Sequence, residues 1–364
     1  MTEKIVRLGI IGCGEVTQVI HLPTLHQLRD RFTLTALCDI SAKVRDGVGD
    51  AWGVARRFAD YRDLIADADV DAVLIANPHV YHAEAALAAM QAGRHVLIEK
   101  PMCITNAEAD ALITREAASG VVAQVGYMRR HAPAFAAAKA RIAALTNIRL
   151  ARVHDVLGRN ALIVGQTATV IRPDDIPAEA SEDMQALLSK RVAEAIGPAP
   201  RALENAYTLL LGLGTHDLSA MRELFGMPVR VLYAAHRGED GRVISAALDY
   251  GAFVCQYETC IDAIPRFDAH IEVYTHNEVI RIDYDTPYVR NLPGRLTVTD
   301  VDAAGMARSS TSLAWRDSFL IEWTAFHDSI VNGMRPKTTP TDAREDLVLF
   351  LDMIAAMRSA SETA

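Results

Sequence analysis

Short apolar segments alternate with helical segments along the first part of the chain. Apolar runs cover residues 5–11, 33–38, 71–76, 95–98 and 121–125, and the clearest helical stretches cover residues 83–92 and 106–119. Short continuous apolar strands separated by helices are typical of a parallel sheet covered on both faces. We therefore predict a doubly wound α/β domain that binds its ligands at the carboxyl ends of its strands.

The second half of the chain has a different pattern, in which strand-like runs follow one another with turn signals between them. These runs cover residues 229–236, 243–250, 252–261, 269–274 and 278–284. Before them, residues 159–204 carry apolar side chains at helical spacing, at Met184, Leu187, Leu188, Val192 and Ile196. We expect an amphipathic helix packed on the sheet there; the alternatives are a lid over the substrate and a subunit contact.

Composition narrows the class of protein. A chain of 364 residues suggests two domains, and a net charge of −9 argues against a general partner of nucleic acids or anionic membranes. The five cysteines show no metal-ligand spacing, which favours reduced structural thiols, and we expect no metal. No apolar run approaches the ~20 residues of a membrane span, and no signal peptide is visible. We expect a cytoplasmic protein.

A glycine-containing turn follows the first predicted strand and opens a helix. It reads Gly12, Cys13, Gly14, Glu15, Val16 and Thr17. Gly12 permits the tight turn, and Gly14 lets the backbone approach a pyrophosphate, which the helix N-terminus stabilises. Thr17 stands where the full pattern has a third glycine, so the match is incomplete and a plain strand–helix turn is the alternative.

Asp39 ends the second predicted strand and supports the cofactor interpretation. It follows the glycines at the spacing, about 20 residues, at which a carboxylate accepts the adenosine-ribose hydroxyls. A carboxylate there repels a ribose phosphate, so NAD is favoured over NADP. Lys43 and Arg45 lie close enough in sequence to contact a phosphate, which keeps NADP open. The other interpretation of Asp39 is a turn residue before Ser41.

Together, these and other segments resemble the Gfo/Idh/MocA family of oxidoreductases. The matching segments are residues 9–14 with His21-Leu22-Pro23, residues 76–82 (Ala-Asn-Pro-His-Val-Tyr-His), Glu99-Lys100-Pro101, Gly214-Thr215-His216 with Leu224-Phe225-Gly226, and residues 326–343. The resemblance implies an N-terminal Rossmann domain, placed at residues 1–127. It also implies a C-terminal α/β domain, residues 128–364, with a large, mostly antiparallel open sheet that binds substrate. Such a sheet commonly supports homodimers or homotetramers.

Lys100 and His216 are the candidate catalytic residues. Lys100 ends a buried strand beside the expected nicotinamide, where partial desolvation would lower its pKa and suit it to proton transfer. Histidine titrates near neutral pH, so we assign His216 as the base toward the substrate hydroxyl and Lys100 as its stabilising or relaying partner. The two roles could be exchanged.

Further residues are predicted to contact the cofactor from the ends of other strands. They are Ala76, Asn77, Pro78, His82, Glu99, Lys100, Tyr127 and Arg129, in addition to the glycine turn and Asp39. The sequence departs from the family at Gly212, where relatives often carry an active-site aspartate. Asp217, Asp155 and Tyr207 are candidate substitutes.

The sequence therefore predicts an NAD-dependent dehydrogenase. It would transfer hydride between nicotinamide and a secondary alcohol of a sugar, cyclitol or glycoside, a small carbohydrate-like substrate. One alternative is an enzyme that cleaves glycosides through transient oxidation and elimination, which the missing aspartate leaves open. Another is a non-catalytic NAD-binding sensor, against which the presence of both Lys100 and His216 argues.

Overall fold

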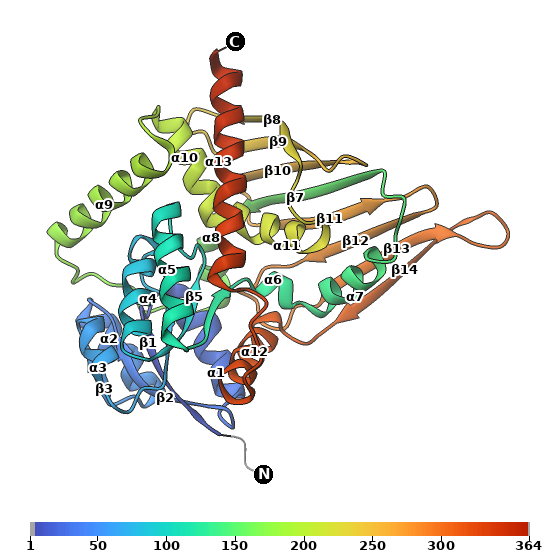
Figure 1. Cartoon of the computed structure of the whole chain (residues 1–364). Coiled ribbons are helices and arrows are strands. Elements are labelled where there is room, and N and C mark those ends of the chain that lie inside the picture. Colours follow the sequence, from blue (N-terminus) through green and yellow to red (C-terminus); the bar gives the residue numbers. More distant parts are fainter. Residues whose placement is uncertain (1–3, 363–364) are drawn as a thin grey trace. The chain divides into compact units, whose positions relative to one another are not determined.

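The computed structural model describes residues 4–362, which divide into two compact units. Unit 1 comprises Met1–Tyr127, Ala168–Ala195 and Phe319–Leu347, and unit 2 comprises Met128–Thr167, Ile196–Ser318 and Val348–Ala364. Two segments that follow residue 127 in the sequence are thus part of the first unit. Figure 1 shows the elements of each unit in the colours of the sequence.

Unit 1 is built on a six-stranded sheet in which every neighbouring pair is parallel. Its spatial order is β3-β2-β1-β4-β5-β6. The strands are β1 (Val6–Ile11), β2 (Phe32–Cys38), β3 (Arg56–Phe58), β4 (Ala72–Ile75), β5 (His95–Glu99) and β6 (Ala123–Gly126). Because the strands are parallel, the turns after β1, β2, β4 and β5 all lie at the carboxyl edge of the sheet. Such sheets bind ligands at this edge, near the point where the strand order reverses, which here is at β1.

Helices connect and cover these strands. They are η1 (Thr17–His21), α1 (Leu22–Gln27), α2 (Ala42–Trp52), α3 (Tyr61–Ala66), η2 (His79–Tyr81), α4 (His82–Gln91), α5 (Asn106–Ser119), α9 (Ala178–Ile196) and α12 (Ser318–Asn332). A capping box of Thr105 and Glu108 starts α5. The late helix α12 belongs to the same core, because Trp323 and Phe326 are buried with Leu8 and Phe32. Helix α13 (Pro340–Glu362) begins in unit 1 and ends in unit 2.

Unit 2 contains an eight-stranded sheet of order β14-β13-β12-β11-β7-β10-β9-β8. Its strands are β7 (Leu150–Gly158), β8 (Arg230–Arg237), β9 (Val243–Asp249), β10 (Val254–Asp262), β11 (Phe267–Tyr274), β12 (Glu278–Tyr284), β13 (Gly294–Val301) and β14 (Ala307–Ala314). Among the described strands of this second sheet, only β7 and β10 pair in parallel. The predicted fold class, a Rossmann sheet followed by a mostly antiparallel sheet, is confirmed.

The helices of unit 2 are α6 (Met128–His131), α7 (Pro133–Ile142), α8 (Asn160–Thr167), α10 (Arg201–Leu209), η3 (Leu210–Gly214) and α11 (Thr215–Phe225). All five strands predicted in the first half of the chain form, and so do the five predicted in the second half. Their ends are shifted by at most two residues. Four strands, β3, β7, β13 and β14, were not predicted. Over residues 4–362, no helix combines the length and apolar character that crossing a membrane requires.

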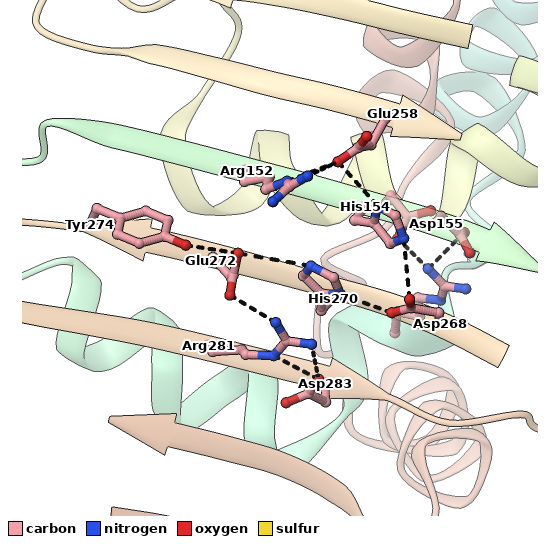
Figure 2. Close-up of polar contacts among 12 residues, drawn as sticks. Arg152, His154, Asp155, Glu258, Asp268, His270, Glu272, Tyr274, Arg281 and Asp283 are labelled. Carbon is pink, nitrogen blue, oxygen red and sulfur yellow. Dashed lines mark hydrogen bonds and ion pairs between the residues drawn. The ribbon is translucent and has the colours of Figure 1, made fainter. Parts of the chain in front are cut away.

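A network of charged side chains spans the middle of the unit 2 sheet (Figure 2). The rings of His154 on β7 and His270 on β11 stack with centroids 4.7 Å apart. Asp268 lies 3.4 Å from Nε2 of the first ring and 3.1 Å from Nδ1 of the second. Arg152 and Glu258 continue the network through a hydrogen bond of 2.8 Å. This part of the sheet therefore has a polar face with its charges internally paired.

Candidate cofactor and catalytic sites

The turn after β1 is shaped by Gly12, as the sequence predicts. Gly12 has a φ of +92°, and a Cβ there would lie 2.5 Å from the backbone oxygen of Ala76, so no other residue fits without a shift. A Cβ at Gly14 would meet no atom within 4 Å. The hydroxyl of Thr17 donates to the Gly12 carbonyl at 2.6 Å. Threonine thus stabilises the turn at the position where the pattern has its third glycine.

Asp39 lies directly beside this turn. Its carboxylate accepts the N–H of Cys13 through Oδ2 and the N–H of Ser41 through Oδ1, both at 2.9 Å. Asp39 is therefore both a turn residue before Ser41 and an acid held against the glycine turn. Each carboxylate oxygen can accept a further hydrogen bond, which leaves capacity for ribose hydroxyls.

The turns after β4 and β5 are tied together by His82. Its Nε2 lies 2.7 Å from the carbonyl oxygen of Asn77, and its Nδ1 lies 2.8 Å from that of Pro101. Burial lowers the pKa of this imidazole despite the two carbonyl partners. His82 is only 2% exposed, so it holds Asn77 and Pro101 in place from within the fold.

Glu99 is held in the ionised state next to Lys100. Trp323 donates its indole N–H to Nδ1 of His21 at 3.1 Å, so the ring proton of a neutral His21 lies on Nε2, 2.9 Å from Glu99 Oε1. The backbone N–H of Lys100 donates to Glu99 Oε2 at 3.1 Å. Burial acts to raise the pKa of Glu99, but His21 and the nearby positive charge of Lys100 lower it below its ordinary value.

Sequence reasoning missed two residues of this arrangement. His21 entered only as part of a family motif, and Trp323 was not singled out at all. A buried histidine at the start of the first helix is a weak signal. Trp323 gave no signal, because it is 302 residues from its hydrogen-bond partner in the sequence.

Two observations indicate that the residues of unit 1 fit a bound dinucleotide. The space beside Gly14 is open, as a closely approaching pyrophosphate requires. The side-chain oxygen Oδ1 of Asn77 is buried and has no hydrogen-bond partner within residues 4–362. Such an atom is costly unless a ligand or water satisfies it, and it lies at the carboxyl end of β4.

His216 belongs to unit 2, where it lies in the first turn of α11 and is 9% exposed. Gly214 precedes it at the end of η3. A Cβ at Gly214 would lie 2.7 Å from the hydroxyl of Tyr257 on β10, so the close approach of η3 to β10 favours glycine there. A Cβ at Gly212 would meet no atom within 4 Å. The departure from the family at Gly212 is therefore not forced by packing.

Arg129, Asp155 and Asp217 form a buried cluster in unit 2. Nη1 of Arg129 lies 3.1 Å from Oδ2 of Asp155 and also pairs with Oδ1 of Asp217. Both carboxylates are fully buried, and Arg129 is 4% exposed. Burial raises the pKa of Asp217 well above its ordinary value, an effect that Arg129 only partly opposes and Asp155 reinforces. One guanidinium thus serves two carboxyl groups, and the raised pKa of Asp217 favours its protonated form.

The structure gives the positions of the other predicted site residues. The hydroxyl of Tyr127 donates to Asp346 at 2.6 Å inside unit 1, and the guanidinium of Arg129 lies over the ring of Tyr284, 5.1 Å from its centroid. Tyr207 is fully buried in α10. The cofactor contacts of Tyr127 and Arg129 stay predictions. Across the described residues, no group of three or more His, Cys, Asp or Glu is arranged to hold a metal ion.

Comparisons with known proteins agree with this geometry. Residues 6–127 match the family model GFO_IDH_MocA, described as an oxidoreductase family with an NAD-binding Rossmann fold. The inositol 2-dehydrogenase of Salmonella typhimurium is 35% identical over 127 residues, which are 34% of this chain and 38% of that protein. Inositol 2-dehydrogenase 3 of Saccharopolyspora erythraea is 26% identical over 338 residues, 90% of this chain and 86% of that protein.

Solved structures extend the likeness of fold to the whole chain. The scyllo-inositol dehydrogenase of Lactobacillus casei has a TM-score of 0.72 at 19% identity, covering 99% of this chain and 98% of that one. A 3-ketoreductase of Actinomadura kijaniata, solved with TDP-benzene and NADP, has a TM-score of 0.72 at 18% identity, covering 98% of each chain.

Unit 1 therefore carries the cofactor-binding domain of a Rossmann-fold oxidoreductase. Residues 6–127 match the Gfo/Idh/MocA family model, in agreement with the sequence motifs. The chain matches the Salmonella typhimurium inositol 2-dehydrogenase over 38% of that protein's length.

Proposed function

We propose that this protein is an NAD-dependent dehydrogenase that acts on a secondary alcohol of a sugar, cyclitol or glycoside. In the oxidative direction the carbon-bound hydrogen would leave as hydride to the nicotinamide ring, and the hydroxyl proton would pass to a protein base. The substrate becomes a ketone while NAD⁺ becomes NADH. Inositol dehydrogenases among the relatives favour a polyhydroxylated ring as substrate.

The observation that carries the proposal is the gathering of predicted residues at one edge of the parallel sheet. Gly12 and Gly14 follow β1, Asp39 follows β2, Asn77 follows β4 and Lys100 follows β5. Those four strands are neighbours in the order β2-β1-β4-β5. A dinucleotide laid along this edge would meet the glycine turn with its pyrophosphate and approach Lys100 with its nicotinamide.

Lys100 and His216 supply the proposed proton chemistry. Lys100 directly follows Glu99 at the end of β5, and its side-chain amine would stabilise a developing alkoxide there. His216 is the proposed base for the hydroxyl proton. The rest of unit 2 is the proposed substrate-binding part, and we also propose that its sheet supports a homodimer or homotetramer.

The proposal is tested by incubating the protein with NAD⁺ and a panel of inositols, aldoses and simple glycosides. A rise in the absorbance of reduced nicotinamide with one compound is expected. Release of the aglycone from a glycoside with no net NADH would instead indicate cleavage by transient oxidation. Binding of NAD⁺ without turnover of any member of the panel in either direction would favour a sensor.

Lys100→Met gives the corresponding test of mechanism. With the substrate so found, turnover should fall by about 10²–10⁴-fold, because proton transfer and alkoxide stabilisation are lost, while NAD⁺ still binds. Lys190→Met is a matched control, since Lys190 is an exposed lysine of α9 in the same unit. Equal turnover in the two variants would remove Lys100 from the mechanism.

A further inference from the structure

The segment between α8 and α9 is fixed against the predicted cofactor turns within unit 1. The side-chain amide of Gln18 forms two hydrogen bonds with the backbone of Ile171, of 2.9 Å to its carbonyl and 2.8 Å from its N–H. Arg172 pairs with Glu15 of the glycine turn at 2.6 Å. We call residues 171–175 the acidic strap, because the segment ends in Asp174 and Asp175.

The end of the acidic strap places a carboxylate at the N-terminus of α2. Asp175 accepts the hydroxyl of Ser41, the N-cap residue, and the backbone N–H of Lys43 at 2.9 Å. These hydrogen bonds lower the pKa of Asp175, so the group stays ionised. The first N–H groups of a helix have no partner inside the helix and form a ready anion site. In this protein, a carboxylate of the chain takes that site.

The remaining cations near this helix terminus are paired as well. The ammonium of Lys43 lies 2.6 Å from Asp174, and Arg45 lies 3.1 Å from its neighbour Asp46. Sequence reasoning kept NADP open because of Lys43 and Arg45. In the folded protein, both of these positive charges are engaged by carboxylates.

This arrangement bears on the choice of cofactor, given the proposed binding of a dinucleotide to unit 1. In a Rossmann domain the acid after the second strand accepts the ribose 2′-hydroxyl, and the residues next to it receive the 2′-phosphate of NADP. Here that acid is Asp39, which accepts the N–H of Ser41. A 2′-phosphate would therefore have to enter the space between Asp39 and the N-terminus of α2, where Asp175 is bound.

We propose that Asp174 and Asp175 determine cofactor specificity. Asp175 occupies the N-terminus of α2 and Asp174 pairs with Lys43, and a 2′-phosphate would need both of these positive groups. The acidic strap acts together with Asp39: Asp39 binds the free 2′-hydroxyl of the adenosine ribose, and the strap repels a phosphate in its place. The chain therefore selects NAD⁺ over NADP⁺ through a segment that lies more than a hundred residues after the Rossmann motif.

The test is the double variant Asp174→Asn/Asp175→Asn, with dissociation constants of NAD⁺ and NADP⁺ measured by isothermal titration calorimetry. Removing two negative charges and freeing Lys43 should tighten NADP⁺ binding by about tenfold or more. The dissociation constant of NAD⁺ should stay within about threefold of the wild-type value, because NAD⁺ carries no charge at the 2′-position of its adenosine ribose. The fragments 5′-AMP and 2′,5′-ADP should reproduce the difference without the nicotinamide half.

Glu182→Gln is the matched control for net charge. Glu182 is an exposed carboxylate on α9 in the same unit, so this variant should leave the NAD⁺ to NADP⁺ ratio unchanged. Because Asp175 caps a helix, Asp174→Asn alone is the second variant; its side chain is 72% exposed and its loss should not affect folding. It should tighten NADP⁺ binding by about threefold.

Two outcomes would overturn the inference while leaving dinucleotide binding intact. One is wild-type protein that binds NADP⁺ as tightly as NAD⁺. The other is a double variant, shown to be folded by circular dichroism, whose preference matches that of Glu182→Gln. Wild-type protein that binds neither nucleotide would overturn the proposed function itself, and the inference with it.

Discussion

Each unit buries a carboxylate site, and the fold shifts the pKa of one acid in each site in opposite directions. In unit 1, Glu99 is a single carboxylate that faces Nε2 of His21 and the charge of Lys100, and its pKa is lowered. In unit 2, Asp155 and Asp217 share one guanidinium, that of Arg129, and the pKa of Asp217 is raised. Both sites are almost fully inaccessible to water.

The difference shows that burial alone does not decide the charge of an acid. A buried anion is tolerated when hydrogen-bond donors and positive charge match it, and it takes up a proton when they do not. Glu99 has a donor for each oxygen, His21 for Oε1 and the backbone of Lys100 for Oε2. The unit 2 cluster would carry a net negative charge if both acids ionised.

The largest expected effect comes from removing the shared cation. Arg129→Met leaves two buried carboxyl groups without a positive partner, which should cost about 3–5 kcal/mol of unfolding free energy. Urea unfolding followed by circular dichroism measures this loss. Arg152→Met is the control, because that arginine is 46% exposed and its pair with Glu258 should contribute less than about 1 kcal/mol. Similar losses in the two variants would show that the cluster is not paired as described.

A smaller effect is expected in unit 1. Glu99→Gln should reduce the unfolding free energy by about 2 kcal/mol, because an amide cannot accept from both His21 and the backbone of Lys100. The wild-type advantage should shrink as the pH falls through the lowered pKa of Glu99, since the carboxylate is then protonated. Glu84→Gln, at an exposed ion pair with Arg62, serves as the control. A wild-type advantage that did not change with pH would argue against an ionised Glu99.

The smallest effect should have the opposite pH dependence. Asp217→Asn keeps the size and neutral charge of the protonated acid. Folded wild-type protein retains a proton that the unfolded chain releases above its ordinary pKa, so its stability falls as the pH rises. The variant should therefore gain about 1 kcal/mol relative to wild type between pH 4 and 6. A relative loss over that range, measured by urea unfolding, would mean that Asp217 is ionised in the fold.

The sequence determined the local parts of this protein. The change from strand–helix alternation to successive strands predicted the fold class, because apolar periodicity reports which face of each element is buried. The glycine turn, Asp39 and Lys100 were predicted from their positions at strand ends. These features depend on residues close together in the chain.

Only the tertiary structure decided how distant residues combine. It pairs Trp323 with His21, brings Asp155 and Asp217 onto Arg129, and binds Asp175 to the cap of α2. No sequence pattern marks such partners, because their spacing depends on how whole elements pack. The protonation of an acid and the charge at a helix terminus follow from those contacts, so the chemistry of the buried groups could be assigned only in the folded chain.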